Sequence, residues 1–156
     1  MKELIMPALA VTKVLVVLSR PDEDGALMKA ARRRGWPVLH DPTPGQLMHE
    51  VRLGWVRVVV VQIDRPVEEA LQLIGELRQY WRPIYVVAAA TRSNMDLEQV
   101  VRCAGANCFL AMSDVSRQLD DVVDRLLRAD GELKIRACRA PIGVEHTAQA
   151  GVDWSG

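Results

Sequence analysis

The sequence is short of the residues on which most covalent and metal chemistry depends. Its 156 residues include three histidines, three cysteines and one phenylalanine, and its formal net charge is zero. A Ser-His-Asp or Cys-His arrangement cannot be assembled credibly from so few histidines. The cysteines are odd in number and lack CxxC spacing, so we expect free thiols in a reducing compartment rather than disulfides or a zinc site.

The sequence also has no excess of positive over negative charge, or the reverse, and no long apolar run. Lys plus Arg and Asp plus Glu each number 20, a balance that does not favour nucleic acid or an anionic membrane as a partner. Lys13 interrupts the apolar stretch near the start, and no uncharged run approaches the roughly 20 residues that cross a bilayer. We therefore expect a cytoplasmic protein that binds neither a membrane nor nucleic acid directly.

Signatures of cofactor-dependent enzymes are absent as well. The segment LSRPDEDG after the first apolar run is neither a dinucleotide-binding turn nor a P-loop. His40, Asp41 and His49 are the only grouping that resembles metal ligands, and their spacing is irregular. We expect no enzyme activity, no metal and no cofactor.

What the chain does contain is a regular alternation of apolar runs and amphipathic segments. The predicted strands cover residues 14–18, 38–40, 56–63, 84–88 and 108–112, and the predicted helices cover residues 24–34, 43–53, 67–81, 93–104 and 116–128. Five such units in about 120 residues predict an α/β fold of the flavodoxin-like, doubly wound type. It has five parallel strands in the order 2-1-3-4-5. We expect one domain over residues 11–130 and a C-terminal extension over residues 131–156, where the periodicity stops.

The stretch VVVVQIDRPVEEALQLIGELR resembles the third strand and third helix of response-regulator receiver domains. A strand ends at Gln62, Pro66 follows four residues later, and a helix comes next. The Gly105-Ala106 step before the last strand also matches this family of CheY-like domains. The resemblance covers roughly residues 11–130 and implies a role in two-component signal transduction or phosphorelay.

The same resemblance implies that the phosphorylation chemistry has been lost. Carried over position by position, Gln62 stands at the aspartate acceptor, Leu18 and Ser19 at the acidic pair, Ala88 at the Thr/Ser position and Met112 at the Lys position. A glutamine amide cannot form an acyl phosphate, and without clustered carboxylates Mg²⁺ has no adequate oxygen cage. The chain therefore looks like a degenerate pseudo-receiver with no catalytic residues.

Three functional hypotheses follow. The first is a phosphorylation-independent module for signalling or transcriptional regulation that binds a protein partner or homodimerises. The second is a small-molecule sensor that uses the vestigial acceptor pocket. The third is a receiver phosphorylated at a displaced aspartate, Asp64, with Asp22, Glu23 and Asp24 as the acidic group.

Mixed charge on the fourth and fifth helices suggests where a partner would bind. In receivers the face made by the fourth helix, fifth strand and fifth helix is the usual partner surface. The corresponding residues are Arg92, Glu98, Arg102, Arg117, Asp121 and Arg125. The run Arg32, Arg33 and Arg34 is interpreted as cations favoured at a helix C-terminus.

Overall fold

Five parallel strands form one sheet in the order β2-β1-β3-β4-β5, which confirms the predicted topology. The computed structural model describes residues 13–19, 25–63, 67–80, 83–91 and 94–139. The strands are β1 (Val14–Leu18), β2 (Val38–His40), β3 (Val58–Ile63), β4 (Tyr85–Ala90) and β5 (Cys108–Ala111). The helices are α1 (Ala26–Arg34), α2 (Pro44–Arg52), α3 (Val67–Arg78), α4 (Met95–Ala104) and α5 (Val115–Arg139), with a 3₁₀ turn, η1, at Met112–Asp114.

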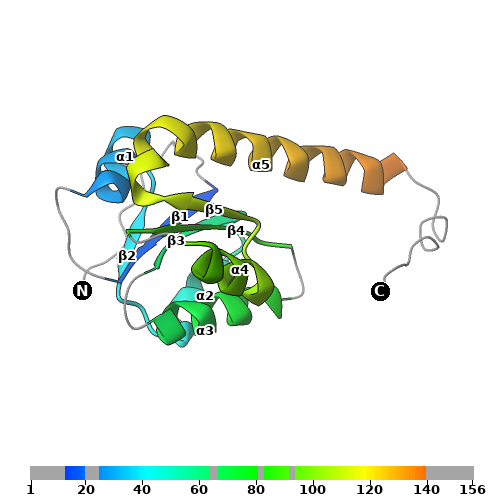
Figure 1. The fold of residues 1–156 in the computed structure, drawn as a ribbon. Coiled ribbons are helices and arrows are strands. Elements are labelled where there is room, and N and C mark those ends of the chain that lie inside the picture. Colours follow the sequence, from blue (N-terminus) through cyan, green and yellow to red (C-terminus); the bar gives the residue numbers. More distant parts are fainter. Residues whose placement is uncertain (1–12, 20–24, 64–66, 81–82, 92–93, 140–156) are drawn as a thin grey trace.

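The sheet lies between two helical layers, with α1 and α5 on one face and α2, α3 and α4 on the other (Figure 1). Every residue of β1 and β3 is buried, because both faces of a central parallel strand are covered. Alternate side chains enter different layers. Val58 and Val60 pack with α1 and α5, whereas Val59 and Val61 pack with the other three helices.

Local hydrogen bonds explain where the helices begin and end. The Thr43 hydroxyl oxygen accepts a bond from the Gln46 backbone N–H (3.1 Å), and the Gln46 side-chain Oε1 accepts one from the Thr43 backbone N–H (2.8 Å), which forms a capping box before α2. Asn94 caps α4 by accepting from Leu97 N at 2.7 Å. Gly35 ends α1 with φ 74°, a conformation that a residue with a Cβ resists.

Asn107 fixes the last strand against β4. Its backbone N–H donates to the Val86 carbonyl, and its side-chain Oδ1 accepts from the Val86 N–H, both at 2.8 Å. The side chain thus supplies a ladder bond that the backbone alone would not make at the start of a strand. This sets the register in which Ala90 pairs with Ala111.

Helix α5 is longer than the sequence predicts. It runs to Arg139 rather than ending near residue 128, and so crosses the boundary expected at residue 130. The prediction ended the helix too early because Asp130, a charged residue that is buried on the inward face, interrupts the apolar pattern. A single glycine inside a helix, as at Gly131, costs only about 1 kcal/mol. Residues 140–156 of the expected extension lie outside the described residues. Among the described helices, none combines the length and apolarity that a membrane span requires.

Candidate functional site

The carboxyl ends of β1 and β3 meet at the edge where ligands bind in folds of this type. Val17 pairs with Val61, so Leu18 and Gln62 are the next residues along these neighbouring strands. Gln62 is 6% exposed and lies on the α1/α5 side, in step with Val58 and Val60. The residue at the expected acceptor position is therefore a buried amide.

One oxygen of this amide binds Ser19 twice. Gln62 Oε1 accepts from the Ser19 backbone N–H at 2.8 Å and from the Ser19 hydroxyl at 3.2 Å. A buried amide is costly unless it is hydrogen-bonded, and these bonds meet that requirement. They also tie the end of β3 to the residue that follows β1. The arrangement joins two of the sequence-predicted pocket residues by direct contact.

The neighbouring pocket residues are apolar and packed. Leu18 is 2% exposed and belongs to the core between the sheet and the α1/α5 layer. Met112, the first residue of η1, is partly buried against the same core. Neither side chain offers a charge to a phosphoryl group or an oxygen to Mg²⁺.

The strand register corrects one of the pocket positions. Ala88 pairs with Val61 and packs on the α2/α3/α4 face, away from Gln62. Ala89 is the register partner of Gln62 and packs on the same face as it. The prediction missed this because it ended β4 at residue 88, two residues early. Ala89 therefore replaces Ala88 beside Gln62, and it likewise has no hydroxyl.

The second strand also reaches this edge. His40 pairs with Leu18, and the Asp41 backbone N–H donates to the Leu18 carbonyl at 2.6 Å, with Asp41 at φ 46°. The residues that follow β2 are thus joined to the end of β1. In the described part of the chain, no three His, Cys, Asp or Glu side chains gather as metal ligands would.

Several predicted site residues cannot be placed. Asp64, the displaced acceptor candidate, lies outside the described residues, and so do Asp22, Glu23 and Asp24 of its acidic group. Arg92 of the predicted partner surface does so too. The hypothesis of a displaced acceptor therefore stays a prediction.

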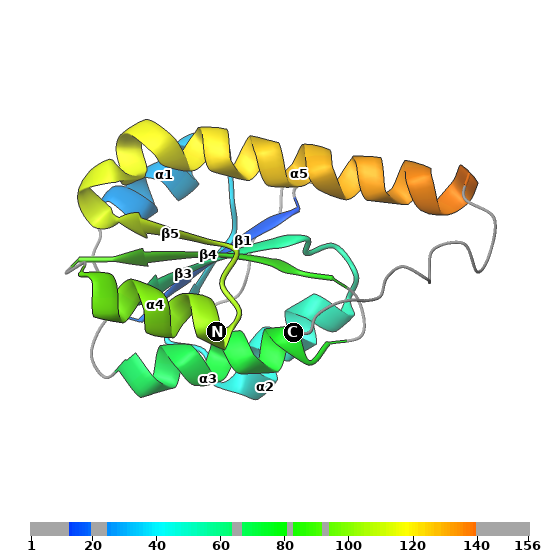
Figure 2. The same ribbon diagram turned by 45° about the vertical axis from the view of Figure 1, so that its right-hand side comes forward.

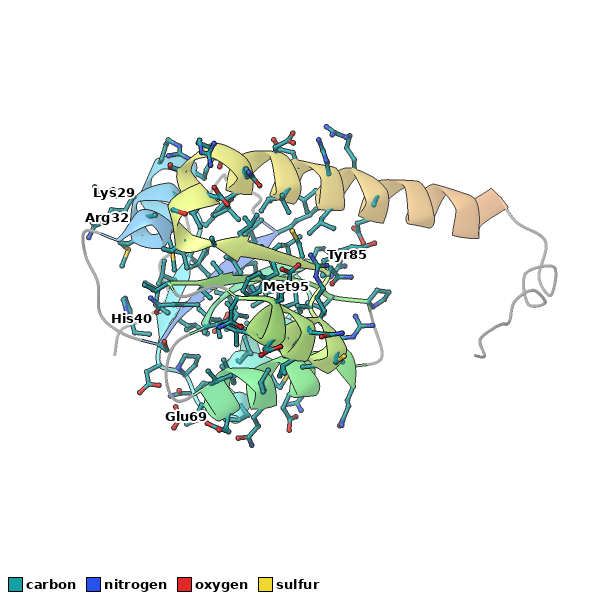
Figure 3. The ribbon with its side chains drawn as sticks, viewed as in Figure 1. Lys29, Arg32, His40, Glu69, Tyr85 and Met95 are labelled. Carbon is teal, nitrogen blue, oxygen red and sulfur yellow. The ribbon has the colours of Figure 1, made fainter. Side chains whose placement is uncertain are left out.

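The remaining charges of the predicted partner surface each pair with a residue three or four positions away in the sequence. Arg102 binds Glu98 on α4 at 2.9 Å, and Arg125 binds Asp121 on α5 at 2.9 Å. Arg117 pairs with Asp114 of η1. Large apolar side chains are exposed beside these pairs on α4, at Met95 (83%; Figure 3) and Val100 (48%).

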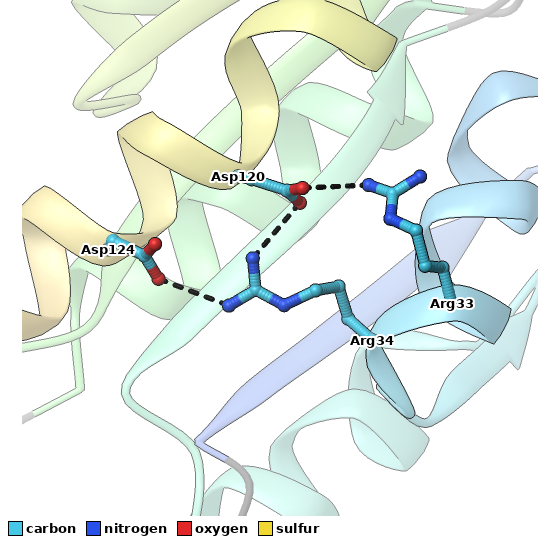
Figure 4. Close-up of polar contacts among 4 residues, drawn as sticks. All are labelled: Arg33, Arg34, Asp120 and Asp124. Atoms are coloured by element: carbon cyan, nitrogen blue, oxygen red, sulfur yellow. Dashed lines mark hydrogen bonds and ion pairs between the residues drawn. The ribbon is translucent and has the colours of Figure 1, made fainter.

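Ion pairs between distant elements occur at two places and were not predicted: a cluster between α1 and α5, and a single pair between Arg57 and Asp130. At the end of α1, Arg33 binds Asp120 (2.8 Å), while Arg34 binds both Asp120 and Asp124 (3.1 Å each), as Figure 4 shows. The four-residue spacing of the two aspartates places them on one helix face, but it does not identify their partners on α1. The single pair, Arg57 with Asp130 at 3.8 Å, had no such spacing signal.

Two cysteines, Cys103 and Cys108, have side chains that the structure describes, and both are free. Cys103 is exposed on α4, and Cys108 is half-buried at the start of β5. Burial, the largest influence, raises the pKa of the Cys108 thiol, and Arg102 opposes this shift. A raised pKa leaves less thiolate, which makes Cys108 a poor nucleophile.

Solved structures of receiver domains share this fold. A response regulator from Thermotoga maritima matches with a TM-score of 0.60 and 19% identity, over 75% of this chain and 98% of that one. A CheY-like receiver domain protein from Methanospirillum hungatei JF-1 matches with a TM-score of 0.55 and 15% identity, over 79% and 99%. A receiver protein from Pseudoalteromonas atlantica matches with a TM-score of 0.60 and 13% identity, over 75% and 98%.

The sequence comparisons add no closer relative. No family model matches the chain, and no curated protein matches it significantly. At the identities of the structural matches, the likeness establishes architecture only. The chain therefore has the flavodoxin-like fold of CheY-like response-regulator receiver domains.

Proposed function

We propose that this chain is a phosphorylation-independent pseudo-receiver that works in signal transduction or transcriptional regulation. It acts by binding a protein partner or a second copy of itself, in the cytoplasm and without enzymatic activity. The observation that carries the proposal is the double hydrogen bond from Ser19 to Gln62 Oε1. It occupies the place where a receiver would hold an aspartate acceptor beside an acidic pair.

The chemistry of this contact supports the proposal. Acyl phosphate formation needs a carboxylate nucleophile, and the amide of Gln62 cannot supply one. Phosphoryl transfer also depends on cations that stabilise the transferred charge. Leu18, Ala89 and Met112 bring methyl and thioether groups to this edge instead. A signal that reaches this domain would then arrive by binding rather than by phosphorylation.

The exposed surface of α4 supports a partner-binding role. Met95 and Val100 each expose apolar surface on α4, while Glu98 and Arg102 of the same helix pair with each other. Protein interfaces combine apolar side chains of this kind with polar groups at the rim. No observation favours the small-molecule sensor over this role, because Leu18 and Gln62 are already buried against protein groups.

The test is incubation of the full chain with acetyl phosphate and Mg²⁺, followed by intact-mass measurement. A phosphorylatable receiver serves as the positive control. We expect no phosphoryl adduct and no response of tryptophan fluorescence to Mg²⁺. An adduct would overturn the proposal. If Asp64→Asn abolished that adduct while Gln62→Leu kept it, the displaced acceptor would be established instead.

The interaction half of the proposal needs its own measurement. Sedimentation of the chain over a range of concentrations should reveal a monomer–dimer equilibrium that Val100→Asp weakens. The control Lys29→Asp, at an exposed position of α1, should leave it unchanged. A monomer at all concentrations excludes the homodimer. A heterologous partner would then be sought by capture with the parent and Val100→Asp forms compared.

A further inference from the structure

Asp130 is the one charged side chain that is buried in the described part of the chain. It lies on α5, near Arg57 just before β3 and Tyr85 at the start of β4. Gln62 lies at the other, carboxyl-terminal end of β3. Burial of a carboxylate is expensive unless a cation and hydrogen bonds compensate for it. A buried aspartate on an otherwise apolar helix face is therefore expected to have a compensating cation.

Its cation is Arg57, which precedes β3. Arg57 Nε lies 3.8 Å from Asp130 Oδ2, and both side chains are nearly enclosed, at 14% and 10% exposure. Arg57 Nη1 also donates to the Val56 carbonyl at 2.9 Å. This bond ties the guanidinium to the backbone just before β3.

The backbone of Arg57 is equally constrained. Its N–H donates to the Lys13 carbonyl at 2.8 Å, and its carbonyl accepts from the Tyr85 N–H at 2.9 Å. Arg57, immediately before β3, is thus hydrogen-bonded on one side to Lys13, which precedes β1, and on the other to Tyr85 at the start of β4. An ion pair to Arg57 fastens α5 to the rigid frame of the domain.

Asp130 lies in the carboxyl-terminal half of α5, nine residues before the helix ends at Arg139. The helix runs along one face of the sheet, and its carboxyl-terminal part, the α5 projection, extends beyond the sheet (Figures 1 and 2). Nine residues of helix correspond to about 14 Å of projection. A small rotation of α5 at Asp130 would move the end of this projection over a much larger distance.

We propose that Arg57 and Asp130 form a clasp that sets the direction in which the α5 projection leaves the domain. An apolar pair at these positions would pack without a desolvation cost, but it would accept several rotations of the helix. A charge pair restricts the helix more, because rotations that separate Asp130 from Arg57 move a buried carboxylate away from this cation. The inference does not depend on the proposed loss of phosphorylation.

Spin labels on Cys103 of α4 and Cys138 of the projection measure this direction. The Cys108→Ala background removes the third thiol, and an excess of unlabelled chain suppresses distances between copies. The parent should give one narrow distance distribution. Asp130→Asn should broaden or shift it, while the matched control Asp121→Asn, which breaks an exposed pair on the same helix, should reproduce the parent.

A parent-like distribution in folded Asp130→Asn would overturn the clasp. If that variant fails to fold, the double variant Arg57→Met with Asp130→Leu removes both charges and keeps the volume. A cooperative thermal transition together with a broadened distribution supports the proposal. A narrow, parent-like distribution in the double variant shows that packing alone directs the helix and overturns it.

Discussion

The side chain of Arg78 at the end of α3 lies directly over Gly105, which ends α4. Gly105 has φ 130°, and a Cβ there would overlap the Arg78 side chain. Gly105→Ala should therefore lower the free energy of unfolding by about 1–3 kcal/mol, mainly through backbone strain. Urea unfolding followed by circular dichroism measures the change.

Gly75 provides the matched control for that substitution. It lies inside α3, and a Cβ there would meet no atom of the described residues within 4 Å. Gly75→Ala should stabilise the protein by about 0.5–1 kcal/mol, because alanine loses less backbone freedom in a helix. Equal effects of the two alanines would contradict the assigned strain at residue 105.

The contact between Gln62 and Ser19 should matter for stability as well as for chemistry. Gln62→Leu leaves the Ser19 N–H without this acceptor and should cost about 1–3 kcal/mol. Ser19→Ala removes only the longer hydroxyl bond and should cost about 0.5–1 kcal/mol. Urea unfolding measures the stability loss of each variant. A larger loss for Ser19→Ala than for Gln62→Leu would contradict the view that the backbone bond contributes most.

Arg34 should contribute more to the α1–α5 contact than Arg33 does. Arg34 binds two aspartates and lies 5.1 Å from the centre of the Trp36 ring, whereas Arg33 binds Asp120 alone. These groups are 30–50% exposed, so solvent screening limits the expected loss for Arg34→Ala to about 1 kcal/mol. Thermal melting at low and high salt measures the stability that Arg34→Ala loses. If high salt does not reduce this loss, the contribution of Arg34 comes from packing rather than from its charge.

Tyr85 should make the protein sensitive to alkali. Burial, and secondly the charge of Asp130, raise the pKa of the Tyr85 phenol above 10.0. Between the unfolded and folded pKa values only the unfolded state releases this proton, so stability is full below pH 10 and falls as the pH rises above it. Tyr85→Phe should lessen this alkaline loss, as measured by urea midpoints from pH 8 to 11.

The same substitution should cost little at neutral pH. The Tyr85 hydroxyl is buried and has no hydrogen-bond partner among the described residues, so its removal relieves a desolvation penalty rather than breaking a bond. Tyr85→Phe should therefore be neutral or stabilising at pH 7. A loss of more than about 1 kcal/mol would show that the hydroxyl makes a contact that stabilises the fold.

The sheet order and the Gln62 position were predictable because both depend on patterns that are local in sequence. The valine run of β3, the Thr43 cap and Gly35 each specify their own element. The end of β4 was missed because three consecutive alanines carry a weak strand signal. That error of two residues was enough to place Ala88 rather than Ala89 beside Gln62.

The ion pairs were not predictable because their partners meet only in the folded chain. Arg33 and Asp120 are 87 residues apart in sequence, and spacing within one helix cannot report such a contact. The end of α5 was missed for a different reason. Asp130, a charged residue at an inward position, interrupts the apolar pattern. The sequence therefore predicted a helix that ends at residue 128, just before the residue that pairs with Arg57.

The strands differ in length across the sheet, and this has a consequence for how copies of the chain can associate. The two central neighbours β3 and β4 have six residues each, whereas the outer strands β2 and β5 have three and four. An outer strand with so few free backbone groups is a poor template for adding another strand. Extension of the sheet from one molecule to the next is therefore disfavoured, which protects the native protein from fibrous assembly.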